Sequence, residues 1–197
     1  TIKDLLSNTP IDKSDARILL GHLLEHYLGW PRSALLTKDQ EHLSESLISQ
    51  WRILEECRLQ GQPVAYLIGK KGFYGIELTV SPAVLIPRPE TELLVDFAIE
   101  EIGRRLAHSH ESLELKVLDL GTGSGAIALA LAHALRDSHQ NTLKIAVIGI
   151  DASSDAISLA RENARALDLH PGVQFMQSDW YAGIPREWLG SFDLILS

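Results

Sequence analysis

The sequence is poor in cysteine, in basic residues and in long apolar runs, and each shortage excludes a class of protein. Cys57 is the single cysteine among 197 residues, so no disulfide can form within the chain and a reducing, cytoplasmic setting is expected. Eighteen basic residues face 26 acidic ones, and the net charge of -8 repels a phosphate backbone, so no direct nucleic-acid partner is expected. No run approaches the roughly 18 consecutive apolar residues that span a bilayer, so we expect no membrane partner.

The first part of the chain has the pattern of a small helical domain. Hydrophobic residues make up 45% of the sequence, enough to bury the core of one medium domain and a smaller one. Apolar residues recur at helical spacing over 14–28 and again over 41–60, and a short helix is expected over 63–68. Ser14 is placed to begin the first of these helices and Gly29 to end it. We therefore predict a helical domain over residues 1–72.

A β-hairpin linker is predicted over residues 73–92. Apolar and polar residues alternate over 76–80, which indicates a strand, and its partner is expected over 83–86. Pro87 and Pro89 then stiffen a turn, and acidic residues enrich the start of a helix that runs to about residue 107. The junction between domains is expected here.

The rest of the chain, residues 93–197, has the pattern of an α/β domain. Four apolar stretches indicate strands at 116–120, 144–150, 173–177 and 192–196. Helical patterns separate the first three, at 124–136 and 153–167. Alternation of this kind predicts a parallel sheet covered by helices, a Rossmann-like fold.

A glycine-rich turn follows the first of these strands and indicates a cofactor site. Gly121, Gly123 and Gly125 let the backbone turn sharply and bring its N–H groups against a ligand. The spacing differs from the Gly-x-Gly-x-x-Gly pattern of dinucleotide-binding proteins, which favours a nucleoside without phosphates. The alternative is a tight strand-to-helix turn that binds nothing.

Acidic and aromatic residues follow the next two strands at the same edge of the expected sheet. Asp151 is placed to accept hydrogen bonds from ribose hydroxyls, with a helix N-cap beside Ser153 as the alternative. Asp179 and Trp180 offer a polar contact and an aromatic face for a base, although a tryptophan at such a position can equally be a packing residue.

No metal site is expected. His22 and His26 lie four residues apart on one predicted helix, which is a spacing that metal ligands use. No third ligand lies near them in the sequence, so a solvated helix face is the favoured interpretation.

Longer motifs carry a resemblance to a known family. Residues 118–130, Leu-Asp-Leu-Gly-Thr-Gly-Ser-Gly-Ala-Ile-Ala-Leu-Ala, resemble motif one of class I S-adenosylmethionine-dependent methyltransferases. Residues 80–92, Val-Ser-Pro-Ala-Val-Leu-Ile-Pro-Arg-Pro-Glu-Thr-Glu, are more specific. Together with 61–69 and 177–180 they resemble the HemK or PrmC family of peptide chain release factor glutamine methyltransferases. The resemblance covers nearly the whole chain.

The resemblance implies a fold, a cofactor and a substrate. It implies a class I methyltransferase sheet that binds S-adenosyl-L-methionine, and methyl transfer to the side-chain amide of the glutamine in the Gly-Gly-Gln loop of release factors. It also implies that the helical domain docks the release factor, and we expect a monomer. The implied cofactor-binding residues are Gly121, Thr122, Gly123, Ser124, Gly125, Asp151 and Trp180.

The catalytic residues cannot be assigned within this sequence. The family's Asn-Pro-Pro-Tyr signature is expected directly after the fourth strand, just beyond Ser197. The Asn side-chain oxygen and the adjacent proline carbonyl would hold the substrate amide and aim it at the methyl group. We therefore expect a sheet that is incomplete at its C-terminal side, a chain that is part of a longer polypeptide, and no methyl transfer by these 197 residues alone.

Two alternative functions stay open at this point. Nucleic-acid adenine methyltransferases share the Asn-Pro-Pro-Tyr type of signature, although the acidic charge and the lack of a basic stripe disfavour them. A non-catalytic module that binds S-adenosylmethionine is the second alternative.

Overall fold

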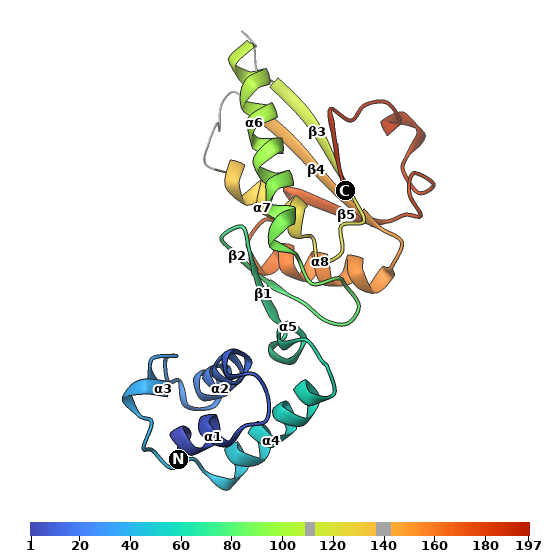
Figure 1. Ribbon diagram of the computed structural model, residues 1–197. Coiled ribbons are helices and arrows are strands. Elements are labelled where there is room, and N and C mark those ends of the chain that lie inside the picture. The colour runs from blue at the N-terminus through green and yellow to red at the C-terminus, as the bar shows by residue number, and fades with distance from the viewer. Residues whose placement is uncertain (109–112, 137–142) are drawn as a thin grey trace. The chain divides into compact units, whose positions relative to one another are not determined.

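A computed structural model describes residues 1–108, 113–136 and 143–197 of the protein (Figure 1). The chain divides into two compact units, 1–69 and 70–197. The hairpin that the sequence suggested as a linker belongs to the second unit, whose first strand begins at Lys70. Each unit has its own hydrophobic core and is described by itself.

The first unit is helical. Its helices are α1 (Ile2–Asn8), α2 (Lys13–Leu28), α3 (Ala34–Thr37), α4 (Glu45–Leu59) and α5 (Val64–Ile68). The two long helices and the short α5 confirm the sequence pattern, whereas α1 and α3 were not predicted. Asp12 rather than Ser14 caps the start of α2, because its side chain accepts hydrogen bonds from the Ser14 and Asp15 amides. Gly29 ends α2 in the left-handed conformation, as expected.

A short antiparallel hairpin opens the second unit. It pairs β1 (Lys70–Phe73) with β2 (Ile76–Thr79), so the prediction that residues 83–86 pair with β2 was wrong. Tyr74 and Gly75 both have positive φ, 47° and 79°, which makes the tight two-residue turn that joins neighbouring strands with the right twist. That turn reverses the chain before Ile76, and residues 83–86 form no strand.

The main sheet of the second unit is parallel, which confirms the predicted fold class. Its strands are β3 (Leu113–Leu120), β4 (Leu143–Asp151), β5 (Val173–Gln177) and β6 (Leu194–Leu196), in the spatial order β5-β4-β3-β6. The helices are α6 (Glu92–His108), α7 (Ala126–Leu135) and α8 (Ser154–Ala166), with short 3-10 turns η1 (Pro89–Thr91) and η2 (Arg186–Trp188). These elements form the parallel α/β sheet of the predicted Rossmann-like fold.

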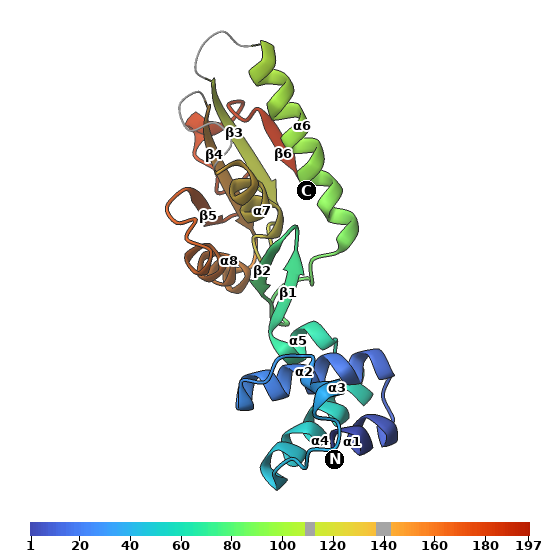
Figure 2. The same cartoon turned by 90° about the vertical axis from the view of Figure 1, so that its left-hand side faces the viewer.

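The two faces of the sheet are covered differently. Val117 and Val147 face a core that α6, α7 and α8 complete, because alternate residues of a strand point to opposite faces. Leu118 and Ile148 face the other way, against Ile184 and its neighbours in the segment between β5 and β6. Figures 1 and 2 show the three helices on one side of the strands and that segment on the other.

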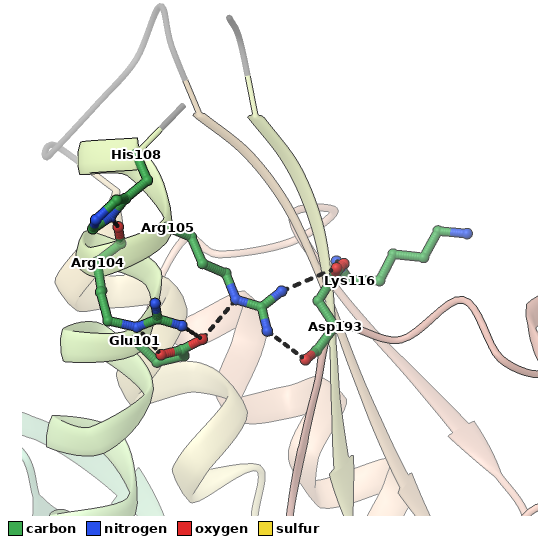
Figure 3. A network of polar contacts seen from close by, with 6 residues as sticks. All are labelled: Glu101, Arg104, Arg105, His108, Lys116 and Asp193. Carbon is green, nitrogen blue, oxygen red and sulfur yellow. Dashed lines mark hydrogen bonds and ion pairs between the residues drawn. The ribbon is translucent and has the colours of Figure 1, made fainter. Parts of the chain in front are cut away.

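A network of polar contacts fastens α6 to the start of β6 (Figure 3). Arg105 donates to Glu101 at 2.7 Å and to the Asp193 carboxylate at 3.3 Å. Asp193 in turn accepts a hydrogen bond from the Lys116 amide at 2.9 Å, which joins it to β3. Hydrogen bonds from Arg104 and Arg105 lower the pKa of Glu101 to about 2. The network sets β6 in register beside β3, where its last residues reach the same sheet edge as the glycine-rich turn.

Candidate cofactor site

The glycine-rich turn leads from β3 into α7. Gly121, Gly123 and Gly125 all have positive φ, at 70°, 55° and 84°, a conformation that other residues rarely adopt. The Thr122 amide donates to the carbonyl of Ile150 at 2.8 Å, which pins the turn to the end of β4. The turn is therefore held at the carboxyl edge of the sheet.

The three glycines serve different needs. A side chain at Gly125 would lie 2.9 Å from Leu129 and 3.0 Å from Phe175, so packing alone explains this glycine. A side chain at Gly121 would meet nothing within 4 Å. The turn thus has one tightly packed end and one open end, and only the open end leaves room for a ligand against the backbone.

Asp119, two residues before the turn, is a buried acid that the sequence analysis did not single out. Its Oδ2 accepts hydrogen bonds from the Thr122 hydroxyl at 2.6 Å and from the Ala128 amide at 3.3 Å. Burial raises the pKa of this carboxyl to about 7, against the lowering effect of the Thr122 hydrogen bond. Its Oδ1 is buried and has no partner among the described residues. The signal in the sequence is an acid inside an otherwise apolar strand.

Asp151, the last residue of β4, holds two backbone segments. Its Oδ2 accepts from the Gly123 amide and its Oδ1 from the Ser153 amide, both at 3.0 Å. Ser153, not Asp151, caps α8, because the Ser153 hydroxyl accepts from the Ala156 amide at 3.2 Å. The carboxylate therefore links the glycine-rich turn to the turn after β4, and each of its oxygens keeps a further lone pair for a ligand.

A pocket of about 190 Å³ lies at this edge of the sheet. It brings together Gly121, Asp151, Asp179 and Trp180, four residues that the sequence had suggested. Its other lining residues are Leu120, Ile150, Ala152, Ser178 and Ser197. The remaining residues of the turn, 122–125, are not among those that line it, and the side chains of Thr122 and Ser124 are buried.

Trp180 stands at the rim of this pocket. Its side chain is 67% exposed, which is not the environment of a packing residue. Its φ of 48° is unusual for a large side chain and is supported by Ser178, whose hydroxyl donates to the Trp180 carbonyl and accepts from the Gly183 amide at 2.8 Å. The backbone of Trp180 is thus held at the pocket, and most of its side chain is exposed.

The chemistry of the pocket suits a cationic nucleoside. None of its described lining residues is basic, so a phosphate would find no counter-charge there. The carboxylates of Asp151 and Asp179 are placed to meet hydroxyl groups or positive charge. S-adenosylmethionine, which carries ribose hydroxyls, an ammonium and a sulfonium, fits this set of groups.

The histidine pair suggested by the sequence, His22 and His26, lies in α2. The two rings stack with their centroids 6.1 Å apart. Across the described residues, no three histidine, cysteine or carboxylate side chains come together as metal ligands would. No helix in the described part of the chain is both long and apolar enough to cross a bilayer.

Comparison with known proteins agrees with this division of the chain. Residues 2–69 match the family model of the PrmC N-terminal domain, and residues 111–197 match that of a methyltransferase domain. The release factor glutamine methyltransferase of Burkholderia pseudomallei is 40% identical over 93% of this chain and 60% of its own length. That of Haemophilus influenzae is 39% identical over 100% of this chain and 64% of its own.

A solved structure, the SAH-bound methyltransferase PaMTH1 of Podospora anserina, is 15% identical with a TM-score of 0.36, over 75% of this chain and 47% of that one. The similarity to release factor glutamine methyltransferases rests on the sequence relatives. The chain spans about 60% of the length of the curated relatives named above. The chain thus has a segment that matches the PrmC N-terminal domain followed by one that matches a methyltransferase domain, and along nearly all of its length it is similar to release factor glutamine methyltransferases.

Proposed function

We propose that this chain binds S-adenosyl-L-methionine at the pocket beside the glycine-rich turn and acts in methyl transfer to a glutamine side-chain amide of peptide chain release factors. The observation that carries the proposal is the pocket itself, where Gly121, Asp151 and Trp180 meet at the carboxyl edge of a parallel sheet. The names of the relatives, release factor glutamine methyltransferase, support the reaction and its substrate.

Each residue has a proposed role in holding the cofactor. Asp151 accepts hydrogen bonds from the ribose hydroxyls while it keeps the turn in place through the Gly123 amide. Trp180 offers its open face to the adenine. Gly121 lets the backbone approach the ligand, and Gly123, Thr122, Ser124 and Gly125 shape the turn. When bound, S-adenosylmethionine supplies an electrophilic methyl group.

The substrate and the unit that docks it are proposed from the comparisons. The helical unit, residues 1–69, would dock the release factor, in keeping with its match to the PrmC N-terminal domain. We propose a cytoplasmic monomer that contacts neither nucleic acid nor membrane. The net charge of -8 and a pocket lining without a described basic residue disfavour the alternative of an adenine methyltransferase acting on nucleic acid.

Calorimetric titration of the chain with S-adenosylmethionine tests the cofactor site. Asp151→Ala removes the ribose acceptor and one anchor of the turn, and we expect it to weaken binding roughly 10- to 100-fold, the range for a lost hydrogen bond to a charged group. Asp155→Ala, a matched change at an exposed position in α8, should bind as the wild type does. A wild-type chain that does not bind S-adenosylmethionine would contradict the proposal.

The partner is tested by binding a release factor and, separately, a duplex DNA to the same chain. Measurable binding of the release factor and none of the DNA at matched ionic strength supports the proposal. Binding of the DNA alone would favour the adenine methyltransferase instead.

A further inference from the structure

A buried asparagine in α8 joins two segments that lie far apart in the sequence. Asn163 is 1% exposed. Its Nδ2 donates to the carbonyl of Thr79 at 3.0 Å and to the carbonyl of Ser124 at 2.9 Å, and its Oδ1 accepts from the Thr79 amide at 2.8 Å. One side-chain amide thus makes three hydrogen bonds, to the end of β2 and to the glycine-rich turn.

The three hydrogen bonds of Asn163 require a side-chain amide at this position. The two hydrogens of an asparagine Nδ2 can serve two carbonyl groups while its oxygen serves an N–H. An aspartate would place a carboxylate against the carbonyls of Thr79 and Ser124, and an alanine would leave three backbone groups without this partner. No other side chain of similar size supplies this pattern.

The two segments also touch without Asn163. Val84, five residues after the end of β2, is 5% exposed, and its Cβ lies 4.0 Å from the position that a Cβ at Gly123 would occupy. The chain that leaves the hairpin therefore lies against the turn that carries the cofactor site. It then runs on to Pro87 and Pro89.

We infer that Asn163 is a positioning residue for the cofactor site, which couples the end of the β-hairpin to the glycine-rich turn through a single side chain. It contacts the Ser124 carbonyl and does not line the pocket, so it acts through the turn. When a ligand orders the turn, the hairpin end at Thr79 becomes ordered with it. The inference rests on the proposed binding of S-adenosylmethionine.

The test compares Asn163→Asp and Asn163→Ala with the wild-type chain by calorimetric titration with S-adenosylmethionine. Both variants should weaken binding about tenfold or more, because the turn loses a hydrogen bond that holds it in the binding conformation. Ile157→Val, which removes one buried methylene from the same helix, controls for a general loss of stability and should keep the wild-type affinity well below its melting temperature.

Hydrogen exchange of the Thr79 amide separates coupling from a merely structural role. In the wild type, S-adenosylmethionine should slow this exchange although Thr79 lies outside the pocket, and Asn163→Ala should abolish the effect of the ligand. A wild-type chain that binds the cofactor, with Asn163 variants that bind equally well or with unchanged Thr79 exchange, would overturn the inference alone. A wild-type chain that does not bind S-adenosylmethionine would overturn the proposed function and this inference together.

Discussion

At the scale of single residues, the cofactor edge is built from acids whose environments differ. Asp119 is buried against the helix face of the sheet with one oxygen unpartnered, and its pKa is raised to about 7 by burial. Asp151 is partly exposed, and both its oxygens accept backbone amides. The first suits a group that changes charge near neutral pH, whereas the second is held in place by two backbone amides.

The raised pKa of Asp119 predicts a pH-dependent stability. Below about pH 4 the carboxyl is protonated in both the folded and the unfolded chain, so its ionisation does not change the free energy of unfolding. Between pH 4 and 7 only the unfolded chain ionises, and the free energy of unfolding falls, by at most about 4 kcal/mol. Asp119→Asn cannot ionise, so we expect its free energy of unfolding, relative to the wild type, to rise from pH 4 to 7 and then level off.

Urea unfolding of both chains from pH 4 to 8 measures this difference. Asp155→Asn, an exposed change in α8, is the control and should show no such trend. If the wild type and Asp119→Asn keep a constant difference in stability across this range, the carboxyl titrates in the folded chain as it does in the unfolded one and the argument fails.

The exposure of Trp180 predicts that its replacement lowers the affinity for S-adenosylmethionine without lowering the melting temperature. Because its side chain is 67% exposed, Trp180→Ala should change the melting temperature little, whereas removal of the aromatic face should weaken S-adenosylmethionine binding about tenfold. Trp180→Phe should recover most of the affinity. Calorimetric titration and thermal melts of both variants, with Tyr181→Ala as a neighbouring control outside the pocket lining, check this. Equal affinities of Trp180→Ala and the wild type would remove Trp180 from the site.

At the scale of elements, the main sheet was predictable because apolar stretches alternate with helical patterns along the chain. The alternation of apolar strands and helices placed β5 at Val173–Gln177 as predicted, and Gly29 ended α2. The hairpin partner was not predictable in the same way. The turn at Tyr74 depends on a positive φ in a bulky residue, which the sequence pattern does not favour.

The buried polar contacts of the site could also not be predicted from the sequence. Asn163 lies on the apolar stripe of α8 with Ala160 and Ala156, and this position predicts burial. Nothing local indicates that its partners are Thr79 and Ser124, which lie 84 and 39 residues away. Contacts of that range come from the fold as a whole and not from local propensity.

Two glycines in different elements predict opposite effects of the same substitution. A Cβ at Gly149 in β4 would lie 2.5 Å from Phe175 and 2.7 Å from the Thr122 hydroxyl, so Gly149→Ala should destabilise the chain by about 1–3 kcal/mol. Gly103 in α6 is exposed with nothing within 4 Å, so Gly103→Ala should stabilise it by roughly 0.5–1 kcal/mol. Urea unfolding of the two variants measures both, and a neutral Gly149→Ala would show that Phe175 can move aside.

At the scale of the whole molecule, the chain has two compact units, and each has its own buried apolar residues. The first unit buries Trp51 and Leu20 among its helices, and the second buries residues on both faces of its sheet. The division falls at residue 69, which is also where the match to the PrmC N-terminal domain ends. Each unit thus has the buried apolar residues that an independently stable domain needs.

This division predicts two thermal transitions, of which the cofactor shifts one. All residues of the pocket lie in the second unit, so S-adenosylmethionine at about 100 times its dissociation constant should stabilise that unit by about 2.7 kcal/mol and leave the first unchanged. Differential scanning calorimetry of the whole chain with and without the ligand measures both transitions, and a fragment of residues 1–69 identifies the one that does not move. That fragment should keep its helical circular dichroism and melt cooperatively, because its core is complete without the second unit. A single transition that shifts as a whole on ligand binding would mean that the two units unfold together. The cofactor would then stabilise the helical unit as well, because the entire chain would unfold in one step.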